Sequence, residues 1–182
     1  PGKGGLEAMR EVRGRGMKIS VVTNSLAATD EPVVHTGYRR YREDMLRLGA
    51  EIYELSSQRT RRSVRLGLFG TQIGRLHAKS AVIDGRTLFV GSMNFDPRSE
   101  VHNTEIGLFI FSREMAQQVL KLVEVLKQQG AYKVRFAPGT ERMEWVSEEA
   151  GVEQVLTSEP DAGFWDHLML ELLAPLAPES LL

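Results

Sequence analysis

His77 and Lys79 are two potentially reactive side chains separated by one residue, and they begin the part of this sequence whose residue types could do chemistry. A turn signal follows them, and the next apolar run leads into Ser92 and Asn94. An imidazole can attack phosphorus or give up a proton near neutral pH. An ammonium supplies charge, while a hydroxyl and an amide supply directional donors. Together these four side chains could bind and react with a phosphoryl group.

The turn signal lies between the two apolar runs and predicts a β-hairpin over residues 75–94. A two-residue turn is expected, either Asp84-Gly85 or Gly85-Arg86. Because side chains alternate between faces with a period of two, both registers place the four polar side chains on one face. A three-residue turn would not place all four side chains on the same face. Asp84 is expected to hold the turn through hydrogen bonds from its side chain to the backbone.

A reactive histidine also needs a carboxylate behind its other ring nitrogen, to fix the tautomer and stabilise the charged form. Glu105, in HNTE before the apolar run GLFIF, is the expected partner of His77. Asp96 is the alternative, but it follows the second strand of the hairpin directly and is typical of a turn.

The elements around the hairpin indicate an α/β fold. A helix over 5–13, a strand over 17–23, a helix beginning at Asp30-Glu31-Pro32 and a strand over 50–55 are separated by short connections, which predicts a βαβ unit. Further along the chain we expect a strand over 104–111, an amphipathic helix over 113–129, strands over 131–136 and 152–157, and a last helix over 164–173.

Two further regions could reach the same site. Thr23, Asn24 and His35 follow the first predicted strand, and loops at that edge of an α/β sheet often line the ligand crevice, so Asn24 and His35 are candidate substrate contacts. The polar stretch after Leu55 holds Arg59, Arg61, Arg62 and Arg65. It is either a solvated loop or a loop that attracts anionic groups towards the hairpin.

The bulk composition narrows the class of partner. The 182 residues hold 23 Lys and Arg against 24 Asp and Glu, so no basic excess favours nucleic acid. There is no cysteine, which excludes disulfides and thiolate metal ligands. The sequence shows no apolar run of about 20 residues that could span a bilayer.

The hairpin sequence HAKSAVIDGRTLFVGSMN resembles the signature of the phospholipase D superfamily, known as the HKD motif: His, one residue, Lys, four residues, Asp, six residues, then Gly-Ser, one residue, Asn. Six residue types at fixed offsets are far more specific than a lone glycine-rich loop. The flanking stretches TNSLAATDEPVVHTGYRRYREDMLRLGAEIYEL, FDPRS and NTEIG are similar to the C-terminal half of bacterial cardiolipin synthases of the third type.

This resemblance implies a phospholipase D-like mixed β-sheet flanked by helices on both faces. It implies phosphatidyl transfer between phospholipids through a covalent phosphohistidine, with no metal and no cofactor. His77 would be the nucleophile or acid–base partner, Lys79 and Asn94 phosphate ligands, Ser92 a supporting donor and Glu105 the residue that orients His77. Asp84 completes the catalytic motif.

Family members carry two copies of the motif, whereas this chain has one, and its other histidines lack a lysine two residues on. We therefore expect residues 1–182 to be a single domain, the second half of a two-motif enzyme, with 131–182 as an extension packed on it. The other half-site would come from an N-terminal portion or a second subunit. A phosphodiesterase acting on nucleic acid as a single-motif homodimer is the alternative.

The resemblance also implies a cytoplasmic protein with peripheral contact to the inner membrane of a bacterium. The C-terminal GFWDHLMLELLAPLAPESLL is expected either to pack on the domain or to rest on a membrane as an amphipathic helix. Asp161 just before this segment, and Asp166 and Glu171 within it, weaken the membrane interpretation, because interfacial helices favour basic residues.

Overall fold

The computed structural model is a mixed α/β structure, and it describes residues 2–29, 32–63, 66, 76–94 and 103–163. Its helices are α1 (Gly2–Gly14), α2 (Pro32–Arg47), α3 (Ser57–Arg62) and α6 (Arg113–Val125), with a 3-10 turn η1 (Leu26–Ala28) and a π-helical segment η3 (Leu126–Gly130). Its strands are β1 (Ser20–Asn24), β2 (Glu51–Leu55), β3 (Lys79–Ile83), β4 (Thr87–Gly91), β5 (Gly107–Phe111), β6 (Ala131–Phe136), β7 (Met143–Glu149) and β8 (Val152–Leu156).

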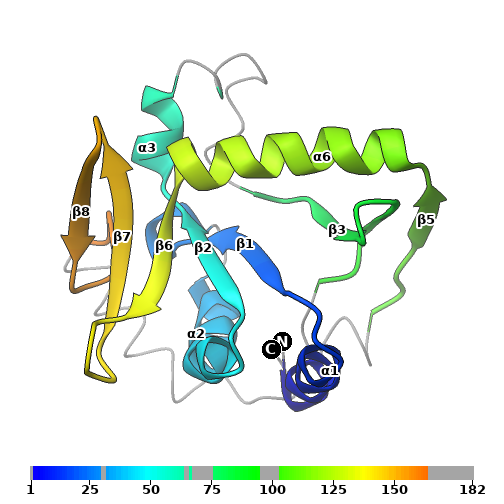
Figure 1. The fold of residues 1–182 in the computed structure, drawn as a ribbon, viewed down its shortest axis with the longest axis horizontal. Coiled ribbons are helices and arrows are strands. Elements are labelled where there is room, and N and C mark those ends of the chain that lie inside the picture. The colour runs from blue at the N-terminus through cyan, green and yellow to red at the C-terminus, as the bar shows by residue number, and fades with distance from the viewer. Residues whose placement is uncertain (1, 30–31, 64–65, 67–75, 95–102, 164–182) are drawn as a thin grey trace.

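Within the described residues, the strands form two sheets, one of five strands in the order β1-β2-β6-β7-β8 and one of three in the order β3-β4-β5. β1 and β2 are parallel, which confirms the predicted βαβ unit, and the remaining pairs are antiparallel. In Figure 1, α6 runs along one side of the strands, and α1 and α2 lie on the other. The predicted α/β class with a mixed sheet and flanking helices is thus confirmed.

The helix ends follow local chemistry. Pro32 opens α2, where its fixed φ suits the first turn, and Gly49 follows that helix with a φ of +80°. The hydroxyl of Ser112 accepts a hydrogen bond from the Met115 backbone N–H at the start of α6.

The main core lies between the five-stranded sheet and the helices α1 and α2. Its buried members are Leu6, Met9, Met45, Ala50, Ile52, Val134 and Trp145. Tyr38, Tyr41 and Leu48 pack against this core. A smaller cluster joins Leu55, Leu66, Leu126 and Ala131.

Two elements differ from the sequence-based expectations. Residues 57–62 form the short helix α3 and not a loop, because the Ser56 hydroxyl caps it by accepting from the Arg59 backbone N–H at 3.0 Å. β7 was not predicted, and it pairs with both β6 and β8. β6 in turn pairs with β2, so residues 131–136 are a strand inside the five-stranded sheet. The helix predicted over 164–173 lies outside the described residues.

Among the described helices, none combines the length and the apolar content that a bilayer crossing requires.

Candidate active site

The turn between β3 and β4 has three residues. Ile83 pairs with Thr87, and Arg86 N donates to Ile83 O at 3.1 Å. Asp84 and Gly85 both adopt left-handed backbone conformations, with φ of 52° and 63°. The predicted two-residue turn is therefore wrong, because strand pairing resumes only at Thr87 and leaves Asp84, Gly85 and Arg86 outside the ladder.

In the observed register, the alternation of side chains along the strands no longer places His77, Lys79, Ser92 and Asn94 on one face of the hairpin. Lys79 pairs with Gly91, and Gly91 pairs with Gly107 on β5, which forms a row across the three-stranded sheet. β4 ends at Gly91, so alternation no longer governs the residues after it. The motif residues instead gather at one end of the sheet, and those within two positions of this row are His77, Ser92 and Glu105.

His77 and Lys79 are in direct contact. Lys79 Nζ lies 3.2 Å from His77 Nε2 and donates to the His77 backbone carbonyl at 3.1 Å. Because an ammonium can only donate, Nε2 is the acceptor, and the ring proton of a neutral His77 lies on Nδ1. The His77 side chain is exposed. A phosphoryl oxygen bound to Lys79 Nζ would therefore bring phosphorus close to an unprotonated ring nitrogen.

Ser92 and Glu105 form a second group beside the row. Ser92 Oγ donates to Glu105 Oε2 and accepts from Ile106 N at 3.0 Å. Glu105 Oε1 also accepts from Asn103 Nδ2 at 3.2 Å. These bonds fix the carboxylate at the start of β5. That Glu105 orients His77 stays a prediction, as does the phosphate-binding role of Asn94, which is half-buried. Asp96 lies outside the described residues.

Two glycines, Gly91 and Gly107, lie where the end of this sheet leaves no room for a side chain. The sequence did not predict this packing role for either of them. A Cβ on Gly91 would lie 2.8 Å from Ile106 O and 2.8 Å from the Phe89 ring, and a Cβ on Gly107 would lie 2.4 Å from that ring. The Phe89 ring therefore covers both glycines, and it packs against Phe109 with 5.1 Å between ring centroids. The ring thus lies beside the strand positions that pair next to Lys79.

Asp84 lies at the opposite end of β3 from Lys79. Five residues of extended chain separate them, which amounts to roughly 16 Å. The left-handed backbone of Asp84 agrees with its expected role in the turn, since Asp tolerates this conformation. From that position its carboxylate does not reach the His77–Lys79 pair. The catalytic role given to Asp84 by the motif stays a prediction.

Asn24 touches the motif hairpin (residues 76–94) in a way that its sequence position did not predict. At the end of β1, its side-chain Nδ2 donates to Leu76 O at 2.9 Å, and its Oδ1 accepts from Leu76 N at 2.7 Å. Leu76 directly precedes His77. The amide expected to contact substrate is therefore used to hold the backbone beside the reactive histidine.

His35, the other candidate substrate contact, is buried in a cluster of charged groups. Its Nε2 lies 3.3 Å from Glu159 Oε2, and its ring packs edge-on against Tyr38. Burial alone would raise the pKa of Glu159, but the close contact with His35 and the Arg42 charge outweigh it and lower that pKa to about 2. Burial, next to the Glu54 carboxylate, raises the pKa of Tyr38 well above its usual value. His35 is therefore buried among charged groups of the fold, and its contact with a substrate stays a prediction.

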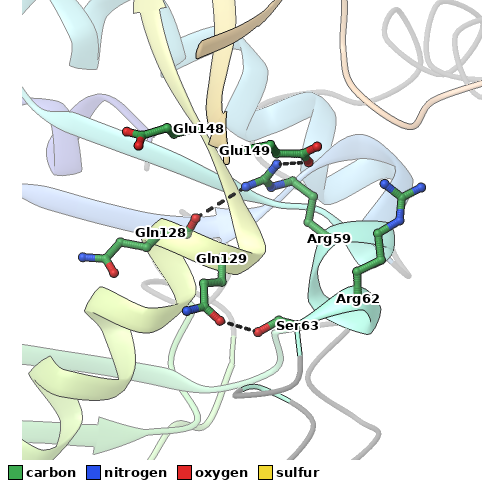
Figure 2. Close-up of a pocket in the computed structure, with 7 residues that line it drawn as sticks. All are labelled: Arg59, Arg62, Ser63, Gln128, Gln129, Glu148 and Glu149. Atoms are coloured by element: carbon green, nitrogen blue, oxygen red, sulfur yellow. Dashed lines mark hydrogen bonds and ion pairs between the residues drawn. The ribbon is translucent and has the colours of Figure 1, made fainter. Parts of the chain in front are cut away.

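A pocket of about 300 Å³ opens between α3, η3 and the end of β7 (Figure 2). Its lining residues are Arg59, Arg62, Ser63, Gln128, Gln129, Glu148 and Glu149. Arg59 is buried, with Nη1 paired to Glu149 at 2.7 Å and its guanidinium over the Tyr132 ring. Two arginines face two glutamates, so the lining has no positive excess. The pairing of Arg59 gives no support to the expectation that the arginine-rich stretch after Leu55 attracts anions. Arg65 of that stretch lies outside the described residues.

The chain belongs to the family described as "Cardiolipin synthase, PLD-like domain", whose model matches residues 1–126. This match covers the motif hairpin and its partner strand, and it confirms the family to which the hairpin residues pointed.

Among known proteins, the chain is similar to "Cardiolipin synthase C" of Escherichia coli K12, with 40% identity over 184 residues that cover 100% of this chain and 39% of the relative. An uncharacterized protein of Helicobacter pylori 26695 is 31% identical over 94% of the chain and 33% of the relative. A "Cardiolipin synthase" of Listeria monocytogenes HCC23 is 25% identical over 84% of the chain and 28% of the relative. The chain thus spans well under half the length of these relatives. No solved structure matches it significantly.

Proposed function

We propose that this chain supplies one half-site of a phosphatidyltransferase that makes cardiolipin. The observation that carries the proposal is the contact between His77 Nε2 and Lys79 Nζ at 3.2 Å, on an exposed end of a sheet. A cation beside a free ring lone pair suits the capture of a phosphodiester followed by attack on its phosphorus. The similarity to cardiolipin synthases narrows the phosphodiester to a phospholipid.

The reaction then runs in two balanced steps. His77 Nε2 attacks the phosphorus of the donor lipid, a P–N bond forms, and the P–O bond to the leaving alcohol breaks. A histidine of the other half-site gives that alcohol its proton. The hydroxyl of the acceptor lipid next attacks phosphorus, passes its proton to the same histidine and displaces His77. In this scheme Lys79 and Asn94 bind the phosphoryl oxygens, Ser92 supports them and Glu105 orients the ring.

A second half-site is required because this chain holds a single motif, and the sheet beside the site supports its presence. The strand GLFIF is apolar throughout, which is typical of a strand covered on both faces. Yet the exposed fractions of its flanking Ile106 and of Phe111 are 73% and 84%. We infer that further polypeptide, an N-terminal HKD half or a second subunit, covers these side chains and completes the site.

We also propose that residues 1–182 form one phospholipase D-like domain that works at the cytoplasmic face of a bacterial inner membrane, in peripheral contact with it. The location follows from the substrate class, since a phospholipid donor and acceptor lie in a bilayer. The near balance of charge argues against nucleic acid as the substrate.

The test uses the full-length protein on phosphatidylglycerol vesicles and on single-stranded DNA. We expect cardiolipin and free glycerol from the vesicles and no cleavage of DNA. His77→Ala should abolish turnover with unchanged circular dichroism, whereas Arg86→Gln, an exposed change in the turn of the same hairpin, should leave turnover within about twofold. DNA cleavage without a lipid product would refute the proposal, and an active His77→Ala enzyme would show that the site is misplaced.

A further inference from the structure

We propose that Asn24 is the positioning residue of His77, holding the reactive ring in place while Lys79 binds the substrate phosphate. The inference rests on the proposed function, because it assigns a role within that reaction. It comes from one contact between the two sheets, formed by residues that are far apart in the sequence.

The Asn24 side chain pairs with both backbone groups of one residue. Its Nδ2 donates to Leu76 O at 2.9 Å, and its Oδ1 accepts from Leu76 N at 2.7 Å. A neighbouring strand would offer a donor and an acceptor in the same way, so the amide acts as a short substitute for a strand. It links the end of β1 to the segment that enters β3. No such link is made by hydrogen-bonded strand pairing, because β1 and β3 belong to different sheets.

Asn24 is itself held in place by its neighbours in the five-stranded sheet. Asn24 pairs with Leu55 in the parallel ladder of β1 and β2, and Leu55 is fully buried. Next to Asn24, Ser25 N donates to Leu55 O at 3.1 Å. The amide therefore projects from a rigid part of the fold, and it fixes the residue directly before His77.

A second contact holds the same segment, but the reaction itself disturbs it. Lys79 Nζ donates to the His77 carbonyl oxygen at 3.1 Å and to His77 Nε2 at 3.2 Å. When a phosphoryl group binds, the ammonium turns its donors towards the phosphate oxygens and gives up part of this hold. The Asn24 bonds involve no phosphate ligand, so they persist. Asn24 thus keeps His77 aligned in the state in which its ring must attack phosphorus.

The residue type matters as much as the position. An aspartate would still accept from Leu76 N, but its second oxygen would face Leu76 O with no proton between them. Two acceptors in this position repel each other and push the segment away. Displacement of a reacting group by about 1 Å can cost on the order of 100-fold in rate. We therefore expect Asn24→Asp to lower kcat by about 10- to 100-fold and to change KM by less than about threefold.

Gln117 provides a matched control at the other end of the hairpin. Its Nε2 donates to Gly85 O at 3.1 Å, which is also a side-chain amide bonded to a backbone carbonyl of the hairpin. Gln117→Glu removes that bond as Asn24→Asp removes the bond to Leu76 O. We expect kcat of the Gln117→Glu enzyme to stay within about twofold of the unaltered protein. Loss of hairpin stability in general would affect both variants alike.

The experiment compares both variants in the full-length protein by steady-state kinetics on phosphatidylglycerol vesicles and by NMR of the His77 ring. Asn24→Asp should shift the ring proton and nitrogen resonances of His77, and Gln117→Glu should not. A normal kcat, equal losses in the two variants, or a rise in KM alone would overturn the inference, the last because it would indicate a substrate contact. If the unaltered protein makes no cardiolipin, the proposed function fails. The ring resonances still decide whether Asn24 positions His77.

Discussion

Arg42 is buried with two carboxylates against it, and its removal is the sharpest test of what holds the fold together. Its Nη1 pairs with Glu54 Oε1 at 2.8 Å, and its Nη2 pairs with Glu159 Oε1 at 2.9 Å. The exposed fractions of the three side chains are 1%, 0% and 5%. The guanidinium also lies over the Trp145 ring, 4.9 Å from its centroid. Arg42 therefore joins α2 to β2 and to the segment after β8.

Arg42→Met would keep most of the apolar stem and remove the charge. Breaking a buried ion pair by removing one partner costs about 3–5 kcal/mol, because the remaining charge is left uncompensated. For Arg42→Met we expect a cost at the low end of this range, because both carboxylates keep other partners. Glu54 keeps neutral donors from Tyr38 and Trp145, at 2.8 and 2.7 Å, and Glu159 keeps His35. We expect the free energy of unfolding to fall by about 3 kcal/mol.

Urea denaturation followed by tryptophan fluorescence measures this loss. The control is Arg15→Met, which breaks the ion pair between Arg15, just after α1, and Glu11 in its last turn. Both side chains of that pair are about two-thirds exposed, so its loss should change stability by under about 0.5 kcal/mol. A decrease below about 1 kcal/mol for Arg42→Met, or equal effects of the two variants, would refute the idea that this cluster carries much of the stability.

Three further predictions concern single positions. The pKa of Glu159 is lowered from its ordinary 4.5 to about 2, so the stability it adds is complete above pH 4.5 and is lost as the pH falls towards 2. It amounts to about 3 kcal/mol, and acid titration of Glu159→Gln should lack this dependence. Gly91→Ala should destabilise the protein by about 1–3 kcal/mol in thermal unfolding, since its Cβ would meet Ile106 O at 2.8 Å. Asp84→Asn should keep the stability and Asp84→Val should lose more than about 1 kcal/mol, because a β-branched residue fits the φ of 52° poorly. Equal melting temperatures for these two variants would contradict the turn role.

Much of this protein could be predicted from the sequence, because the signals are local. Pro32 marked the start of α2, and the short connections indicated parallel β1 and β2. The reactive pair His77 and Lys79 was evident because one residue separates them, and the motif spacing indicated the family. Each of these patterns is contained in a few neighbouring residues or in offsets along one hairpin.

Other features were decided only by the tertiary structure. The turn signal at Asp84 did not reveal whether the turn has two residues or three, and that single residue changed the whole register. Asn24 meets Leu76 across 52 residues, and Arg42 meets Glu159 across 117. No spacing rule connects residues so far apart, because the path of the chain between them sets their distance. The sequence by itself therefore determined which groups can react and in which elements they lie. The packing of two sheets and a buried ion cluster decided that Asn24 meets the residue before His77 and that His35 is buried.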